Sequence, residues 1–202
     1  MAQQKEQEGW GSRERLLAAG ERIFAREGFE AARVEAIAAE AEVNIRMLYH
    51  HFRSKEGLYM EVVRSLHKAA RERVEQVFAR GASAKTTLGL FTRELFQYMR
   101  DNPNFVRILG WDLMHLDRVP ELEALNRDYL FNSLKPQIDH LSQDESRNKA
   151  VDSVHAIFFI FALPFLWFLP RTGFREWIDG RSKKDKDEHF FAQLQSFLEK
   201  GL

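Results

Sequence analysis

Leu48–Lys55, LYHHFRSK, ends a short helical pattern from which the architecture of the chain can be inferred. On a helical wheel of 100° per residue, four side chains fall within about 100° of one another; they are Ile45, Leu48, Tyr49 and Phe52. The window from Val43 to Lys55 also holds three basic residues and two histidines, but no acidic residue. The pattern predicts a helix with one buried side and one cationic side, an arrangement suited to the DNA major groove.

The neighbouring segments predict three further helices around this stretch. A first helix is expected to end at Gly28, because glycine often ends helices in a left-handed conformation, and a second covers Val34 to Ala41. The basic helix is expected to end near Phe52, and a long fourth helix to run from Glu56 to about Arg80. The expected N-caps of the first, third and fourth helices are Ser12, Asn44 and Ser54.

After a break at Gly81–Lys85, the predicted helices contain more aromatic residues. They cover Thr86–Arg100, Phe105–Met114, Pro120–Leu141 and Glu145–Leu169, with a closing helix through Phe190, Phe191, Leu194, Phe197 and Leu198. We expect a kink at Pro136, an interruption at Pro164 and a loop over Gly173–Lys186.

The domain organisation follows from this pattern. Strand-like alternation is missing from the sequence, so the expected fold class is all-α. The predicted N-terminal three-helix helix-turn-helix domain covers residues 1–57, with an ordered part of about 12–57. A long helix would join it to a larger helical domain over residues 58–202.

Composition excludes several classes of site. The chain has no cysteine, which excludes disulfides, thiolate catalysis and cysteine-ligated metals. Its formal net charge is zero, and Met1–Met60 holds nine basic residues against ten glutamates, so any DNA contact must be local. The apolar stretch Ala156–Leu169 is shorter than the roughly 20 residues of a membrane span. With no secretory pattern at the N-terminus, we expect a cytoplasmic protein.

The first third of the chain resembles a known family. The matching residues are Gly28-Phe29, Val34, Ile37-Ala38, Ala41, Val43, Leu48–Phe52, Ser54–Glu56 and Leu58. This order is similar to the DNA-binding domain of TetR/AcrR-family transcriptional regulators, over roughly Arg13 to Leu58. The resemblance implies a homodimer that binds a palindromic double-stranded DNA operator, most often as a repressor that a small molecule releases.

The resemblance also implies roles for individual residues. Tyr49, His51 and Lys55 would contact phosphates, which fix register but carry no sequence information. Arg46 and His50 would read bases, since arginine can donate two hydrogen bonds to guanine. The remaining expected DNA-binding residues are Ile45, which can touch a thymine methyl group, with Arg33, Asn44 and Met47.

Three positions depart from the family pattern. Glu42 stands where the turn usually has glycine, so a non-glycine residue would have to adopt an unfavourable backbone conformation. Arg46 replaces a small residue and should alter operator preference. Arg33 replaces a capping threonine, so the cap is lost while a cation is gained near the DNA.

The second domain carries no comparable motif, and its expected roles come from the resemblance. Helices over about residues 145–169 and 187–198 would pair across a two-fold axis. Candidate ligand-binding residues are Phe91, Leu95, Phe105, Leu109, Trp111, Met114, His115, Tyr129 and Phe158. They would form an apolar, aromatic pocket, with His115, Arg107 or His155 as polar anchors.

Other readings remain open at the level of sequence. Asp112, His115 and Asp117 lack the spacing of a metal site, so we expect neither a metal nor a cofactor. The sequence has no phosphate-binding glycine loop, no nucleophile elbow and no zinc-protease motif, which argues against an enzyme. The same DNA-binding domain could also belong to a transcriptional activator or a ligand-independent regulator.

Overall fold

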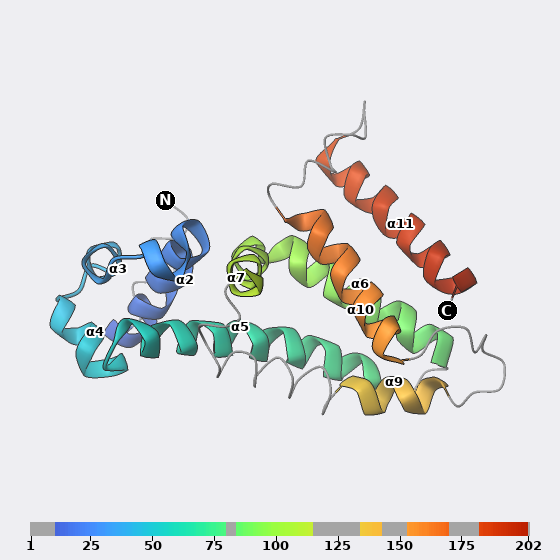
Figure 1. The fold of residues 1–202 in the computed structure, drawn as a ribbon, viewed down its shortest axis with the longest axis horizontal. Coiled ribbons are helices and arrows are strands. Elements are labelled where there is room, and N and C mark those ends of the chain that lie inside the picture. The colour runs from blue at the N-terminus through green and yellow to red at the C-terminus, as the bar shows by residue number, and fades with distance from the viewer. Residues whose placement is uncertain (1–10, 80–83, 115–133, 143–152, 170–181, 202) are drawn as a thin grey trace.

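A computed structural model describes residues 11–79, 84–114, 134–142, 153–169 and 182–201 (Figure 1). Every regular element in these ranges is a helix, as the sequence predicts. Three predicted segments lie partly outside the described residues: Pro120–Leu141, Glu145–Leu169 and Gly173–Lys186.

Three short helices form the N-terminal unit: α2 (Ser12–Ala31), α3 (Val34–Glu40) and α4 (Ile45–Phe52). Their shared interior consists of fully buried apolar side chains, among them Leu16, Ile23, Phe24, Ile37 and Leu48. The predicted bounds of the basic helix and its Asn44 cap are confirmed.

The two ends of α2 differ from the predicted ones. Gly11 is the N-cap, and Ser12 is the first helical residue; the Ser12 hydroxyl instead bonds His51 at 2.7 Å. At the other end, Gly28 has a φ of 78° and interrupts the helix as expected, but a further turn continues to Ala31. The chain thus passes through a positive-φ glycine before it reaches α3.

A long helix, α5 (Lys55–Phe78), runs along the long axis of the molecule (Figure 1). Ser54 caps it, as predicted, by accepting a hydrogen bond from the Gly57 amide at 3.1 Å. α5 packs against α2 near its start and against α6 (Ala84–Asp101) further along. It therefore contributes to the core of both predicted domains.

The remaining helices pack around α6: α7 (Pro103–Leu113), α9 (Lys135–Ser142), α10 (Ser153–Phe168) and α11 (Lys183–Gly201). Pro164 lies inside α10, and Pro136 lies in the first turn of α9, where a missing N–H does little harm. None of the helices in the described ranges is long and apolar enough to cross a membrane.

The predicted loop over Gly173–Lys186 is wrong for its last four residues, which are helical. Ser182 explains the difference, because its hydroxyl accepts from the Asp185 amide at 3.2 Å and donates to the Asp185 carboxylate at 2.7 Å. This pairing satisfies the first turn of α11 despite the charged sequence around it.

Candidate nucleic-acid interface

Helix α4 presents the cationic side that the sequence predicts. Leu48 and Phe52 are buried against the N-terminal core, whereas Arg46 and His50 are exposed and Tyr49 is 49% exposed. The Asn44 side chain accepts from the Arg46 amide at 2.9 Å and so satisfies a free donor of the first turn. Ile45 and Met47 are partly exposed on the same short helix.

The turn that leads into α4 contains the unfavourable conformation expected at Glu42. Its φ is 54°, in the left-handed region. The Glu42 amide donates to the carbonyl of Ala39, and the Val43 amide to that of Ala38, each at 3.1 Å. Two backbone bonds therefore hold the turn without glycine. Arg33 begins α3 with no side-chain cap, as its replacement of threonine implied.

The last turn of α4 is tied to the start of α2. His51 is partly buried, and its Nε2 atom lies 2.7 Å from the Ser12 hydroxyl. The Arg13 guanidinium lies 5.4 Å from the centre of the Phe52 ring and forms an ion pair with Glu61 at 2.7 Å. These contacts hold the C-terminal end of α4 against the first turn of α2.

Lys55 makes contacts that sequence reasoning missed. Its Nζ atom lies within hydrogen-bonding distance of the backbone carbonyls of Phe29, Glu30 and Ala32. No local signal could have revealed this, because the acceptors are backbone atoms distant in sequence. The phosphate contact that the resemblance implies for Lys55 stays a prediction.

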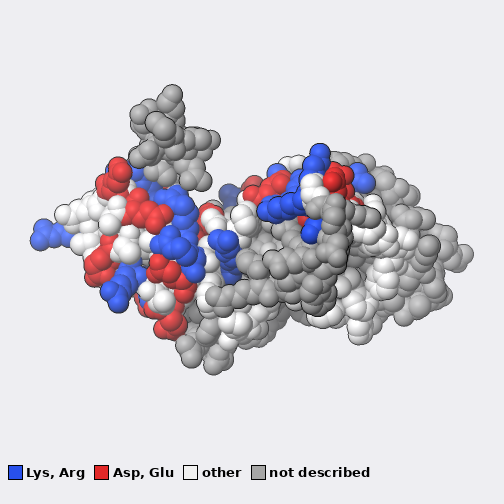
Figure 2. Space-filling model, turned by 90° about the horizontal axis from the view of Figure 1, so that it is seen from above, with Lys and Arg blue, Asp and Glu red and all other residues white. Residues whose placement is uncertain are grey.

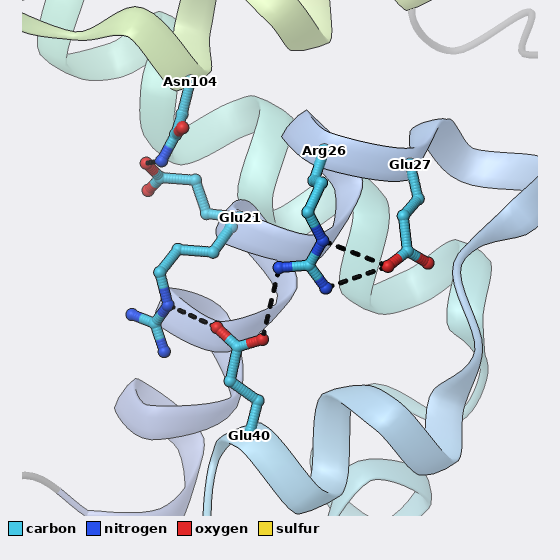
Figure 3. Close-up of polar contacts among 6 residues, drawn as sticks. Glu21, Arg26, Glu27, Glu40 and Asn104 are labelled. Carbon is cyan, nitrogen blue, oxygen red and sulfur yellow. Dashed lines mark hydrogen bonds and ion pairs between the residues drawn. The ribbon is translucent and has the colours of Figure 1, made fainter.

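Ion pairs join α2 to α3 on the outside of this unit. Arg22 lies 2.5 Å from the Glu40 carboxylate, and Arg26 bridges Glu27 at 2.9 Å and Glu40 at 3.8 Å (Figure 3). These side chains are partly exposed, so each pair contributes at most about 1 kcal/mol. On the face of this end that Figure 2 shows, charges of both signs are mixed.

Helix α7 packs directly on the N-terminal unit. The Trp111 ring covers Gly28, and its Nε1 atom donates to the Ala25 carbonyl at 3.4 Å. The Asn104 amide donates to Glu21 at 3.0 Å (Figure 3). Trp111, expected to line a ligand pocket, is thus part of the boundary between the two predicted domains.

A buried hydrogen bond also joins α7 to the long helix: the Tyr59 hydroxyl of α5 donates to the Asp112 carboxylate of α7. Burial, followed by the nearby Asp112 charge, raises the pKa of Tyr59 far above its usual range, so the phenol stays protonated and donates. No group of three or more potential metal-ligating side chains occurs in the described part of the chain.

The other pocket candidates fall into different environments. Phe91, Leu95, Phe105 and Leu109 are buried. Met114 is 68% and Phe158 is 63% exposed in the single chain, while His115 and Tyr129 lie outside the described residues. Arg107 and His155, the proposed polar anchors, are exposed. The described residues therefore do not gather all the candidates at one place.

Helices α10 and α11 present apolar side chains to solvent. On α10, Phe158 and Leu166 are exposed, and on α11 Phe197 is 52% exposed. The rings of Phe159 and Phe197 lie 6.2 Å apart and connect the two helices. This surface coincides with the helices predicted to pair in a dimer.

Comparison with known proteins agrees with this geometry. The profile of the family described as bacterial regulatory proteins, tetR family, matches residues 16–62. The transcriptional repressor NicS of Pseudomonas putida is 29% identical over 104 residues, which are 52% of this chain and 49% of NicS. The repressor KstR2 of Rhodococcus jostii is 28% identical over 122 residues, which are 59% of this chain and 60% of KstR2. The matched region thus spans about half the length of these curated relatives.

Solved structures extend the likeness to the whole fold. SCO4942 of Streptomyces coelicolor superimposes with a TM-score of 0.74 at 22% identity and covers 93% of this chain and 98% of its own. FadR of Bacillus subtilis, solved with stearoyl-CoA, has a TM-score of 0.73 at 19% identity, over 94% of this chain and 98% of its own. The arrangement of the helices outside the N-terminal unit is therefore shared with these proteins.

Proposed function

Because this chain belongs to the tetR family of bacterial regulatory proteins, we propose that it is a dimeric, sequence-specific DNA-binding repressor. In this proposal a small apolar ligand releases it from a palindromic operator. The observation that carries the proposal is α4, a short helix with a buried apolar side and an exposed side formed by Arg46, Tyr49 and His50. In this function the protein catalyses no reaction and acts in the cytoplasm, where bacterial DNA lies.

The exposed side of α4 divides into two kinds of contact. Arg46 and His50 would reach base edges, and the apolar side chains of Ile45 and Met47 would flank them. The residues expected to contact the DNA phosphates are Tyr49, His51 and Arg33, together with the backbone amides at the N-terminus of α4 near Asn44. The zero net charge of the chain favours binding through this helix over binding along the whole domain.

A dimer is needed for two such helices to read a palindrome, since successive major grooves lie about 34–36 Å apart. The exposed aromatic surface of α10 and α11 supports pairing through the predicted ranges 145–169 and 187–198. Burial of such a surface is favourable at roughly 25 cal/mol per Å² of apolar area.

The ligand is proposed to carry a long apolar chain. The fold is shared with FadR, which was solved with stearoyl-CoA, and Phe91, Leu95 and Phe105 supply an apolar interior. A ligand lowers DNA affinity only by its preference for the conformation that does not bind DNA. Packing of α7 on α2 offers a route by which the ligand domain can bias the DNA-binding unit.

Selection of bound fragments from the source genome, followed by anisotropy titration, tests this function. We expect saturable, salt-sensitive binding to a palindrome and its release by long-chain acyl-CoA probes. DNA binding that none of these acyl-CoA probes releases would favour a ligand-independent regulator. Increased transcription from the bound promoter would favour an activator. Absence of saturable binding would overturn the proposal.

A further inference from the structure

All three N–H donors of the Lys55 ammonium group have a backbone acceptor at the end of α2. Nζ lies 2.8 Å from the Phe29 carbonyl oxygen, 3.3 Å from that of Glu30 and 3.2 Å from that of Ala32. A lysine ammonium has three donors, so these bonds use its full capacity. Nζ also lies 4.4 Å from the centre of the Phe29 ring, a favourable cation–π position.

The electrostatics of two helix ends favour this arrangement. The last carbonyl groups of a helix lack partners within it and carry partial negative charge. Gly28 interrupts α2, so the carbonyls that follow it leave the regular ladder. Lys55 is the first residue of α5, where a cation next to the helix N-terminus is unfavourable. Its long side chain carries the charge away from that end to the carbonyls of α2.

The same contacts close a loop around the helix-turn-helix. Phe29–Ala32 precede α3 directly, and Lys55 follows α4 after only two residues. The three bonds span 26, 25 and 23 residues, and both α3 and α4 lie within that loop. The ammonium therefore joins the entrance of the reading unit to its exit.

Two turns inside this loop make such a connection valuable. Glu42 and Arg53 both have positive φ angles, of 54° and 69°, at the start and end of the α4 segment. Neither turn contains glycine, so both conformations must be held by surrounding contacts. A fixed distance between the two ends of the loop limits how far α4 can tilt about these turns.

We propose that Lys55 is a positioning residue for DNA recognition. Its ammonium clamps the end of α2 to the start of α5, sets the orientation of α4 and makes no phosphate contact of its own. This inference rests on the proposed DNA-binding function. It gives Lys55 a role different from the phosphate contact that the family resemblance implies.

Salt dependence separates the two roles. The assay uses the full chain and a fluorescent operator. At each salt concentration between about 50 and 200 mM, we expect Lys55→Met to bind about tenfold or more weakly than the unmodified protein. The slope of log K against log salt should not change, whereas each lost phosphate contact lowers its magnitude by about 0.9. Arg33→Met is the matched control, because Arg33 is exposed at the start of α3 and keeps a proposed phosphate role; its slope should fall.

A charge-preserving variant gives an independent readout. The planar guanidinium of Lys55→Arg cannot place three donors on three converging carbonyls, so we expect it to bind DNA weakly despite its positive charge. Circular dichroism at the assay temperature must show both variants folded, because a residue that acts only on stability leaves the affinity of the folded protein unchanged. If Lys55→Met does not fold, Lys55→Gln replaces it, since its neutral amide lacks the charge and the third donor of the ammonium.

Three results would overturn the clamp: a lower salt slope in Lys55→Met, near-normal affinity in Lys55→Arg, or unchanged affinity in a folded Lys55→Met or Lys55→Gln. Failure of the proposed function looks different, because the unmodified protein would then show no saturable binding to any fragment. In that case both proposals fall together, whereas the three results above leave DNA binding by the unmodified protein intact.

Discussion

Glu42 adopts a left-handed conformation in the turn between α3 and α4, with a φ of 54°. A Cβ atom in this region crowds the following carbonyl at a cost of about 1–2 kcal/mol. We expect Glu42→Gly to raise the free energy of unfolding by about 1 kcal/mol, since the freedom of glycine in the unfolded chain offsets part of the gain. Denaturant titration measures the change. Glu42→Ala keeps the Cβ, so an equal gain there would contradict the backbone explanation.

Gly28 is required both by its backbone and by its neighbour. Its φ is 78°, and a Cβ atom would lie 3.1 Å from the Trp111 ring. We expect Gly28→Ala to lower the free energy of unfolding by about 1–3 kcal/mol. Gly89→Ala is a matched control within α6, where nothing lies within 4 Å of the added Cβ; there alanine should stabilise by about 0.5–1 kcal/mol. Equal effects at the two glycines would refute the argument.

The sequence predicted those helix bounds that are determined by residues within the same short segment. The bounds of α4 follow from the Asn44 cap and the spacing of Leu48 and Phe52, all within one short segment. The start of α11 was missed because the Ser182 and Asp185 pairing lay in a charged stretch that resembled a loop. Such errors arise where one side-chain bond outweighs the average character of its surroundings.

The candidate site was only partly predictable for a different reason. Exposure of Arg46 follows from helical periodicity. The same periodicity placed Tyr49 with the apolar residues of α4, yet this side chain is 49% exposed. The acceptors of Lys55 are backbone carbonyls, which look the same in every sequence. The contact of Trp111 with Gly28 also depends on how α7 returns to α2. Both contacts require the tertiary arrangement to be known first.

Within α4, base-reading and phosphate-binding residues should respond differently to substitution. We expect Arg46→Ala to cost about 1–3 kcal/mol on the preferred operator and little on operators changed at the base pair that it reads. Tyr49→Ala should weaken binding about equally on all sequences, since phosphates carry no sequence information. Competition titrations with single-base operator variants measure both. Uniform loss for Arg46→Ala would exclude a base contact.

His67 couples the folding stability of the protein to pH. It packs edge-on against Phe105, with ring centres 5.7 Å apart; burial, followed by the Arg71 charge, lowers the pKa of His67 to about 4. The unfolded state, with a pKa near 6.5, binds the proton first, so stability is full above pH 6.5 and falls as pH decreases towards 4. We expect the wild type to lose about 2 kcal/mol more than His67→Leu between pH 7 and pH 5. Denaturation at both pH values measures this difference, and parallel losses would contradict it.

The exposed aromatic surface of α10 and α11 should matter only through assembly. Phe158 is 63% exposed in the single chain, and a carboxylate there would have to be desolvated in a dimer interface. We expect Phe158→Asp to shift sedimentation velocity towards monomer and to weaken operator binding at least tenfold, because one α4 then binds without its partner. Met114→Asp is the control, since Met114 is 68% exposed but lies at the end of α7. A Phe158→Asp protein that stays dimeric would exclude this surface, whereas a monomer with full affinity would show that one helix suffices.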